Sequence, residues 1–195
     1  DVTFERTTGM RRFTLTPRVA TDSRGIGPQP DSAGVNPTQP DVRLVLTPAL
    51  PLDARVRSVS INGRAARFAV DKQGDSQFVR IDVGPIAAAA TVAVTLDEGT
   101  EVFRGIDAAP AGESNRGLRI IRARATGSTL SLLAEGLAGE RYPIDVRTPR
   151  QIGVLPHGVT IVRDAATVPD AQRLEVSFEG TAGEYLRREI DIPLR

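Results

Sequence analysis

The chain has 195 residues, of which 40% are hydrophobic and 25% are charged, and its formal net charge is +1. This composition is typical of a folded globular protein, and the near-neutral charge argues against a nucleic-acid or anionic-membrane partner. The chain has no cysteine, which excludes disulfides, thiolate nucleophiles and cysteine-ligated zinc. No apolar run approaches the roughly 20 residues that a membrane-spanning helix needs.

Apolar and polar residues alternate through the first half of the chain, and this period of two predicts β-strands. The pattern covers residues 42–46, 56–61, 66–70, 78–83 and 91–96, with turn residues between the runs. No segment sustains the 3.6-residue period of a helix. Strands of this length, spaced by about 10 residues, are typical of an all-β sandwich or barrel.

The stretch VRSVSINGRAARFAV at 56–70 predicts a β-hairpin. Asn62 and Gly63 are the two residues that tolerate the positive φ angles of a type I′ turn. The hairpin positions expected to face a hydrophobic core are Val59, Ile61, Phe68 and Val70.

Residues 20–41 interrupt the strand pattern with four prolines and several glycines, which predicts a long loop. Loops of about 20 residues are unusual inside a compact domain. The segment is interpreted either as a flexible insertion or as a loop that contacts a partner domain or ligand.

The second half repeats the strand rhythm after a small, polar segment at 105–116. Its strand candidates are residues 117–125, 129–136, 142–148, 158–164, 173–180 and 185–194. We therefore predict an all-β fold of two antiparallel β-sandwich domains in tandem, immunoglobulin-like or fibronectin-like. The first domain spans 1–104 and includes the loop at 20–41, residues 105–116 form a linker, and the second domain spans 117–195.

Catalytic patterns are weak in this sequence. His157 is the only histidine and lies in a predicted turn, and no G-x-S-x-G motif is present, so a serine-histidine triad is not expected. A glycosidase needs two carboxylates in a cleft that holds a sugar. With no Trp and only two Tyr to line such a cleft, a glycosidase site is not expected, and Asp97, Glu98 and Glu101 are expected instead to keep a turn solvated. The carboxylates considered are Asp97, Glu98, Glu101, Glu135, Glu140 and Glu184.

No metal or cofactor is predicted. The segment DKQGD at 71–75 places two carboxylates around a glycine, as a calcium loop does, but it is not the EF-hand pattern and a plain β-turn is the better interpretation. No nucleotide-binding glycine motif follows a strand.

Tyr142 and Tyr185 are the candidate ligand-binding residues. Each begins a predicted strand directly after a turn, so each is placed to stack on a sugar at the rim of a sandwich. The alternative for both is a packing role, with the hydroxyl bound to a loop backbone as in a tyrosine corner.

Several stretches resemble the β-sandwich regions that accompany bacterial polysaccharide-degrading enzymes. RRFTLTPRV and DVRLVLTPALPLDARVRSVSINGRAARFAV look like such regions, and NRGLRIIRARATGSTLSLLAEGLAGERYPIDVRTP with YLRREIDIPL is similar to the C-terminal module of some glycoside hydrolases. The resemblance implies a non-catalytic accessory module of a secreted or periplasmic bacterial enzyme. It would give structural support or bind glycan weakly, and its partners would be the parent catalytic domain and polysaccharide.

Two other functions remain open. The same strands fit an immunoglobulin-like interaction or surface-assembly module that is unrelated to carbohydrate. A stand-alone enzyme with an unrecognised site is the third hypothesis, and a polar pocket in the structure would favour it.

Overall fold

The computed structural model describes most of the chain and shows antiparallel sheets without helix in the described residues, which confirms the prediction of an all-β fold. No helix in this part of the chain is long and apolar enough to cross a membrane. The predicted loop at 20–41 and the predicted linker at 105–116 lie wholly outside the described residues. The described residues are 1–7, 9–16, 43–85, 88–97, 99–104, 117–163 and 169–195.

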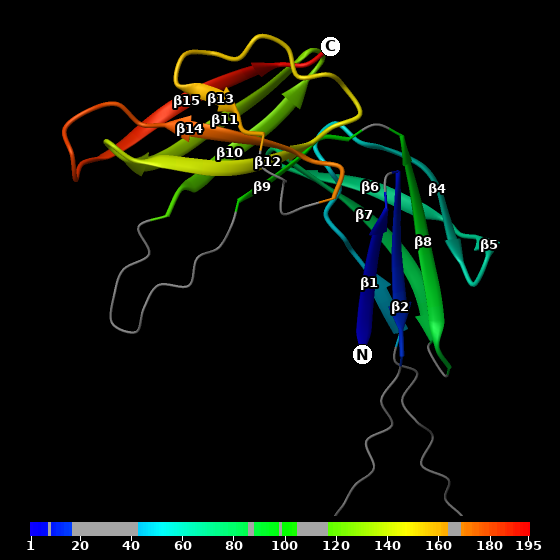
Figure 1. Cartoon of the computed structure of the whole chain (residues 1–195). Helices are drawn as coiled ribbons and strands as arrows, with labels where there is room; N and C mark the ends of the chain where they lie inside the picture. The colour runs from blue at the N-terminus through cyan, green and yellow to red at the C-terminus, as the bar shows by residue number, and fades with distance from the viewer. Residues whose placement is uncertain (8, 17–42, 86–87, 98, 105–116, 164–168) are drawn as a thin grey trace, which may run out of the picture.

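The first half of the chain forms two antiparallel sheets (Figure 1). The five-stranded sheet has the order β1 (Val2–Thr7), β2 (Met10–Leu15), β8 (Ala90–Asp97), β4 (Arg55–Ile61) and β5 (Arg64–Ala65). The three-stranded sheet has the order β3 (Arg43–Leu46), β7 (Ser76–Pro85) and β6 (Phe68–Gln73).

Residues from both of these sheets share one hydrophobic core. Strand β8 alternates strictly between buried and half-buried residues, as its period of two predicts. Val92 and Val94 on β8 and Val79 and Ile81 on β7 are fully buried. The two sheets therefore pack with their apolar faces together. The buried members of this core are Phe13, Leu15, Leu50, Ala54, Val59, Val79, Ile81, Val92, Val94 and Leu96.

The predicted turn at Asn62-Gly63 is confirmed, with φ angles of 51° and 77°. The hairpin that it begins is short, because β4 pairs with β5 only through two residues on each side. The chain then crosses to the other sheet, where β6 forms an edge strand. Phe68 and Val70 are consequently 39% and 42% exposed, so the prediction that they lie in the core is wrong.

The second half of the chain also forms two antiparallel sheets. One has the order β10 (Arg119–Thr126), β11 (Thr129–Leu137) and β15 (Tyr185–Pro193). The other has the order β13 (Val159–Ile161), β14 (Gln172–Ser177), β12 (Arg141–Arg147) and β9 (Glu101–Arg104).

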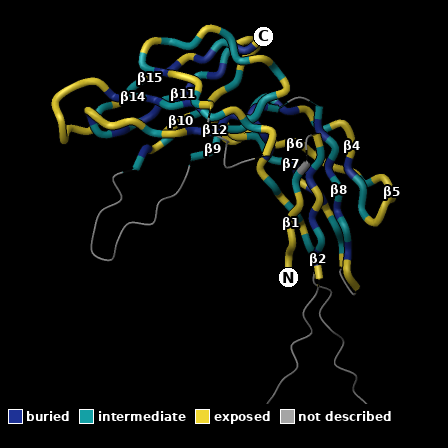
Figure 2. The backbone as a smooth tube through the Cα atoms, viewed as in Figure 1, coloured by how far each residue is buried: buried dark blue, intermediate teal, exposed yellow. Residues whose placement is uncertain are grey.

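A second hydrophobic core lies within this half of the chain, and Figure 2 shows buried stretches in both halves. Both sheets contribute buried side chains to this second core, for example Leu132 on β11 and Leu174 on β14. The buried members are Leu118, Leu130, Leu132, Ala134, Ile144, Val146, Val159, Leu174, Val176, Phe178, Ile190, Ile192 and Leu194.

Strand β9 connects the two halves. The sequence pattern predicted that residues 1–104 form the first domain, and β9 lies within that range. In the structure, however, β9 pairs with β12 of the second half. The chain therefore leaves the first half directly after β8. Figure 1 shows the two groups of strands meeting at an angle, with β1, β2 and β9 near the inner corner.

Candidate functional site

The junction between the halves holds a group of buried and partly buried polar contacts. Thr100, which precedes β9, is fully buried. Its N–H donates to the carbonyl oxygen of Leu52 and its carbonyl oxygen accepts from the N–H of Leu52, both at 2.9 Å. Its hydroxyl lies 3.2 Å from the hydroxyl of Thr148, which follows β12. The backbone of Thr100 therefore binds the first half, at Leu52, and its side chain contacts the second half, at Thr148.

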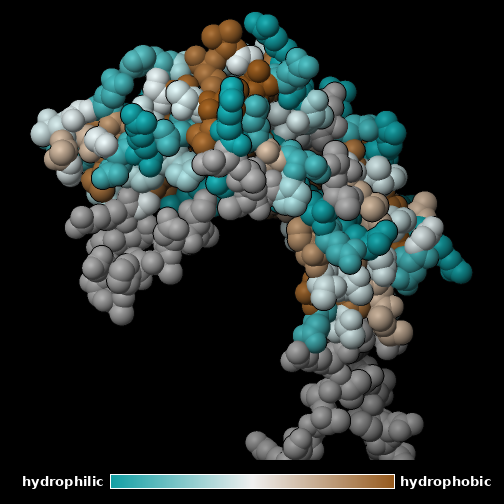
Figure 3. Space-filling model, viewed as in Figure 1, coloured by the Kyte–Doolittle hydropathy of each residue, from teal (hydrophilic) through white to brown (hydrophobic). Residues whose placement is uncertain are grey.

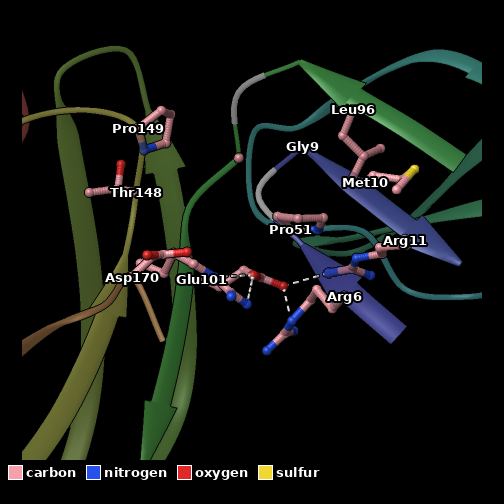
Figure 4. Close-up of a pocket in the computed structure, with 12 residues that line it drawn as sticks. Arg6, Gly9, Met10, Arg11, Pro51, Leu96, Glu101, Thr148, Pro149 and Asp170 are labelled. Atoms are coloured by element: carbon pink, nitrogen blue, oxygen red, sulfur yellow. Dashed lines mark hydrogen bonds and ion pairs between the residues drawn. The ribbon is translucent and has the colours of Figure 1, made fainter. Parts of the chain in front are cut away.

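Glu101, the first residue of β9, is surrounded by three arginines (Figure 4). Its Oε1 accepts from Arg6 Nη1 at 2.9 Å and from Arg11 Nη2 at 2.5 Å. Its Oε2 accepts from Arg147 Nε at 3.1 Å and Nη2 at 2.7 Å. Arg6 and Arg11 come from the first half and Arg147 from the second, so one carboxylate ties the halves together. We call these four residues the Glu101 cluster.

The Glu101 cluster is shielded from water and carries excess positive charge. The side chain of Glu101 is only 14% exposed, and those of Arg11 and Arg147 are similarly covered. Three guanidinium groups face one carboxylate, so positive charge exceeds negative charge by two (3 − 1). The Phe103 ring offsets part of this excess through cation–π contacts, with Arg6 at 4.6 Å and Arg147 at 5.3 Å from its centroid.

Burial disfavours the charged form of two of these arginines, Arg11 and Arg6. It lowers the pKa of Arg11 below its ordinary value, while the attraction of Glu101 opposes that effect. The pKa of Arg6 is lowered by burial in the same way. Arg11 Nη1 also donates to the carbonyl oxygen of Ala49, but the buried Arg11 Nε has no hydrogen-bond partner among the described residues.

A small cavity of about 120 Å³ adjoins the Glu101 cluster (Figure 4). It is bounded by the cluster itself, by the turn residues near β8 and by the segment after β12. Asp170 lines it and adds a second carboxylate. Its other lining residues are Gly9, Met10, Pro51, Leu96, Gly99, Thr148 and Pro149.

Ion pairs also join the halves away from Glu101. Arg124 Nε on β10 lies 2.5 Å from Asp75 Oδ1 in the turn between β6 and β7. Arg150 pairs with Asp53, whose Oδ1 also accepts from the N–H of Thr100 at 3.1 Å. The junction is therefore held at several separate points.

Tyr142, one of the two predicted ligand-binding residues, lies on β12 with its ring packed on the second core. The ring makes an edge contact with Phe178 at 5.8 Å between centroids, and the hydroxyl accepts from the N–H of Leu137 at 3.0 Å. This arrangement matches the packing alternative, in which a tyrosine hydroxyl binds a loop backbone.

Replacing Tyr142 with phenylalanine is expected to lower the free energy of unfolding by about 1 kcal/mol, because the Leu137 N–H loses its acceptor. Urea titration followed by circular dichroism measures the change. Tyr185→Phe is the matched control, since Tyr185 is 45% exposed, and it should leave the midpoint unchanged. Equal effects from both variants would contradict a packing role specific to Tyr142.

Tyr185 lies apart from the core, on the outer face of the sheet formed by β10, β11 and β15. The guanidinium of Arg119 lies 5.8 Å from its ring centroid. Glu135 on the same face accepts from Arg187 at 2.9 Å and from Arg119 at 3.2 Å. The exposed tyrosine therefore borders a ladder of ion pairs, whereas Tyr142 packs on the core.

The hydrogen bond from Arg187 holds the pKa of Glu135 below its ordinary value of 4.5. Folding thus favours the carboxylate form, so its contribution to stability is present above pH 4.5 and is lost as the pH falls through the lower folded pKa. We expect the difference in urea midpoint between wild type and Glu135→Gln to shrink from about pH 6 to about pH 3. A constant difference across that range would contradict this prediction.

The remaining candidates for chemistry lie apart from one another. His157 is exposed, and its Nε2 lies 3.7 Å from Oε1 of Glu179, which is exposed as well. Asp97 pairs with the exposed Arg57. Glu98 lies outside the described residues. Among the residues that are described, no three metal-ligating side chains come together, and the DKQGD segment forms the end of β6 and a turn.

The expectation that Glu101 keeps a turn solvated is wrong. Glu101 begins a strand and binds three arginines that lie 95, 90 and 46 residues away in sequence. The only local signal was the position of an acidic residue directly before the apolar pair Val102 and Phe103. Nothing in that pattern identifies the partners, because they come from distant strands.

No family model, curated protein or solved structure matches this chain. The resemblance to accessory regions of glycoside hydrolases therefore stays a prediction.

Proposed function

We propose that the chain is a non-catalytic accessory module of two immunoglobulin-like β-sandwiches. In this proposal it supports the catalytic domain of a secreted or periplasmic bacterial carbohydrate-active enzyme. The observation that carries the proposal is the junction, where the Glu101 cluster and the Thr100 contacts join the halves at several points.

A fixed junction suits a supporting role. Domains in one chain are ordinarily free to move unless their interface is extensive. Here buried hydrogen bonds and shielded ion pairs hold the two halves, with Asp75 and Arg124 adding a further contact. A module of this kind would hold a neighbouring domain at a set distance and angle.

The arrangement of the carboxylates also favours support over catalysis. Both carboxylate oxygens of Glu101 accept hydrogen bonds from arginines. The carboxylate of the buried Asp145 accepts from Arg173 Nε at 2.9 Å and from Arg173 Nη2 at 3.3 Å. Both carboxylates therefore bind arginine side chains of the chain itself, whereas the two carboxylates of a glycosidase face the scissile bond of a sugar.

The test compares the catalytic domain encoded with this chain when it is expressed alone and when it is joined to the chain. We expect the joined form to melt several degrees higher and the isolated chain to release no sugar from soluble polysaccharides. An unchanged melting temperature, or hydrolysis by the isolated chain, would overturn the proposal.

The second candidate is an immunoglobulin-like interaction or surface-assembly module, and strand β6 favours it. Every residue of β6 is exposed, and among the described strands it has a neighbour, β7, on one side only. Phe68 and Val70 add apolar surface to this open edge, which suits pairing with an added strand. Sedimentation that shifts to larger species with concentration, and reverts in Val70→Lys, would favour this candidate.

A further inference from the structure

A groove of about 530 Å³ lies at the inner corner of the molecule, where β1 and β2 meet β9 and β10. Figure 1 places these strands around the corner, and Figure 3 shows hydrophobic surface along the inner edge of the first half, where β1 lies. The volume falls within the range of about 300–1,000 Å³ that is usual for ligand pockets. The apolar residues that line it include Phe4, Phe13, Val102, Phe103, Ile120 and Ala123.

Phe4 offers the groove an exposed aromatic surface. Its side chain is 49% exposed although it lies on β1, opposite Phe13 of β2. The two rings pack 4.9 Å apart between centroids, so Phe13 supports Phe4 from one side. A supported ring of this kind suits the apolar C–H face of a sugar, as aromatic residues do in many ligand sites.

The Glu101 cluster gives the same groove a positive end, since Arg6, Arg11 and Glu101 all line it. Even when Asp170 in the adjoining cavity is counted, three guanidinium groups exceed two carboxylates by one charge (3 − 2). The side chain of Arg6 is 25% exposed, the most of the three arginines. Its only hydrogen bond among the described residues comes from Nη1, which leaves the rest of its planar donor fork for an incoming carboxylate.

We propose that this groove binds an acidic saccharide, with a uronic acid ring against Phe4 and its carboxylate on Arg6. The inference rests on the proposed function, because it names the class of glycan that an accessory module of this kind would take. An inorganic anion would fill only a small part of the groove and would leave the aromatic wall uncovered. A neutral sugar would leave the excess positive charge unbalanced.

Isothermal titration calorimetry of the whole chain tests the inference with three probes: trigalacturonic acid, neutral galactotriose and polyglutamate. We expect saturable heat with trigalacturonic acid alone, and weaker binding when NaCl rises from about 0.05 M to about 0.5 M. Equal heat with galactotriose, stronger binding of polyglutamate, or no heat with any probe would overturn the inference. Polyglutamate binding would indicate an acidic peptide as the partner.

Single substitutions identify where on the chain trigalacturonic acid binds. Phe4→Ala should weaken trigalacturonic acid binding by roughly fivefold, the loss of one ring contact, whereas Phe4→Tyr should retain it. Phe68→Ala, at an exposed phenylalanine on β6 that does not line the groove, is the matched control and should bind as wild type. Loss of binding in Phe68→Ala with full binding in Phe4→Ala would overturn the inference. Thermal midpoints of all variants show that each is folded.

The two proposals fail separately. If trigalacturonic acid does not bind but the chain still raises the melting temperature of its catalytic domain, only the inferred ligand is wrong. If the chain neither stabilises that domain nor binds the acid trimer, the supporting function fails as well.

Discussion

Replacing Glu101 with glutamine is expected to lower the free energy of unfolding by about 3 kcal/mol, the effect of breaking a largely buried ion pair. Glutamine keeps the shape of the side chain but removes its charge. Arg6, Arg11 and Arg147 would then lie close together without the carboxylate that both halves share. Their mutual repulsion should loosen the junction.

Two measurements separate the consequences of Glu101→Gln. Urea titration reports the loss of stability, and small-angle X-ray scattering reports whether the maximum dimension and flexibility of the chain increase. Glu189→Gln is the matched control, because the Glu189 side chain is 74% exposed and lies 3.4 Å from the exposed Arg122. Exposed pairs of this kind contribute about 0–1 kcal/mol. If Glu101→Gln behaved like this control, the proposed fixed junction would be wrong.

Replacing Leu174 with alanine is expected to cost about 3 kcal/mol, because it leaves a cavity in the core of the second half. Leu174 is completely buried among the side chains of two sheets, which leaves little scope for the surroundings to collapse. In a domain of this size the loss lowers the melting temperature of that half by roughly 10 °C or more.

Calorimetry of Leu174→Ala also tests whether the halves are two domains. We expect two separate heat-absorption peaks, since the first half retains its own core around Ile81. Ile81→Ala is the matched variant and should lower only the other peak. A single peak that shifts equally in both variants would show that the chain unfolds as one unit, contrary to the prediction of two tandem domains.

Local features of the fold could be read from the sequence, because each depends on neighbouring residues. The alternation at 91–96 predicted a strand, and β8 has that alternation of burial with Val92 and Val94 inside. The pair Asn62-Gly63 predicted a turn with positive φ angles, and both residues have them. The first pattern indicates which face of the strand is buried, and the second indicates where the chain turns.

Tyr142 shows an intermediate case. Its place after a turn allowed both a sugar-stacking role and a packing role, and the chain alone left the two open. The structure places its hydroxyl on the Leu137 N–H and its ring against Phe178. Contacts across the two sheets distinguish it from Tyr185, although both residues follow similar turns in sequence.

The sequence by itself thus determined the all-β class, the turn at Asn62-Gly63 and the alternation of burial along strands such as β8. Only the tertiary structure decided that β9 pairs with β12, that Phe68 and Val70 lie at an exposed edge, and that Glu101 meets three arginines. The physical reason is that a period of two specifies the buried face of a strand but not the strand beside it. Strand neighbours, sheet edges and the charges that meet across a junction depend on how distant segments pack.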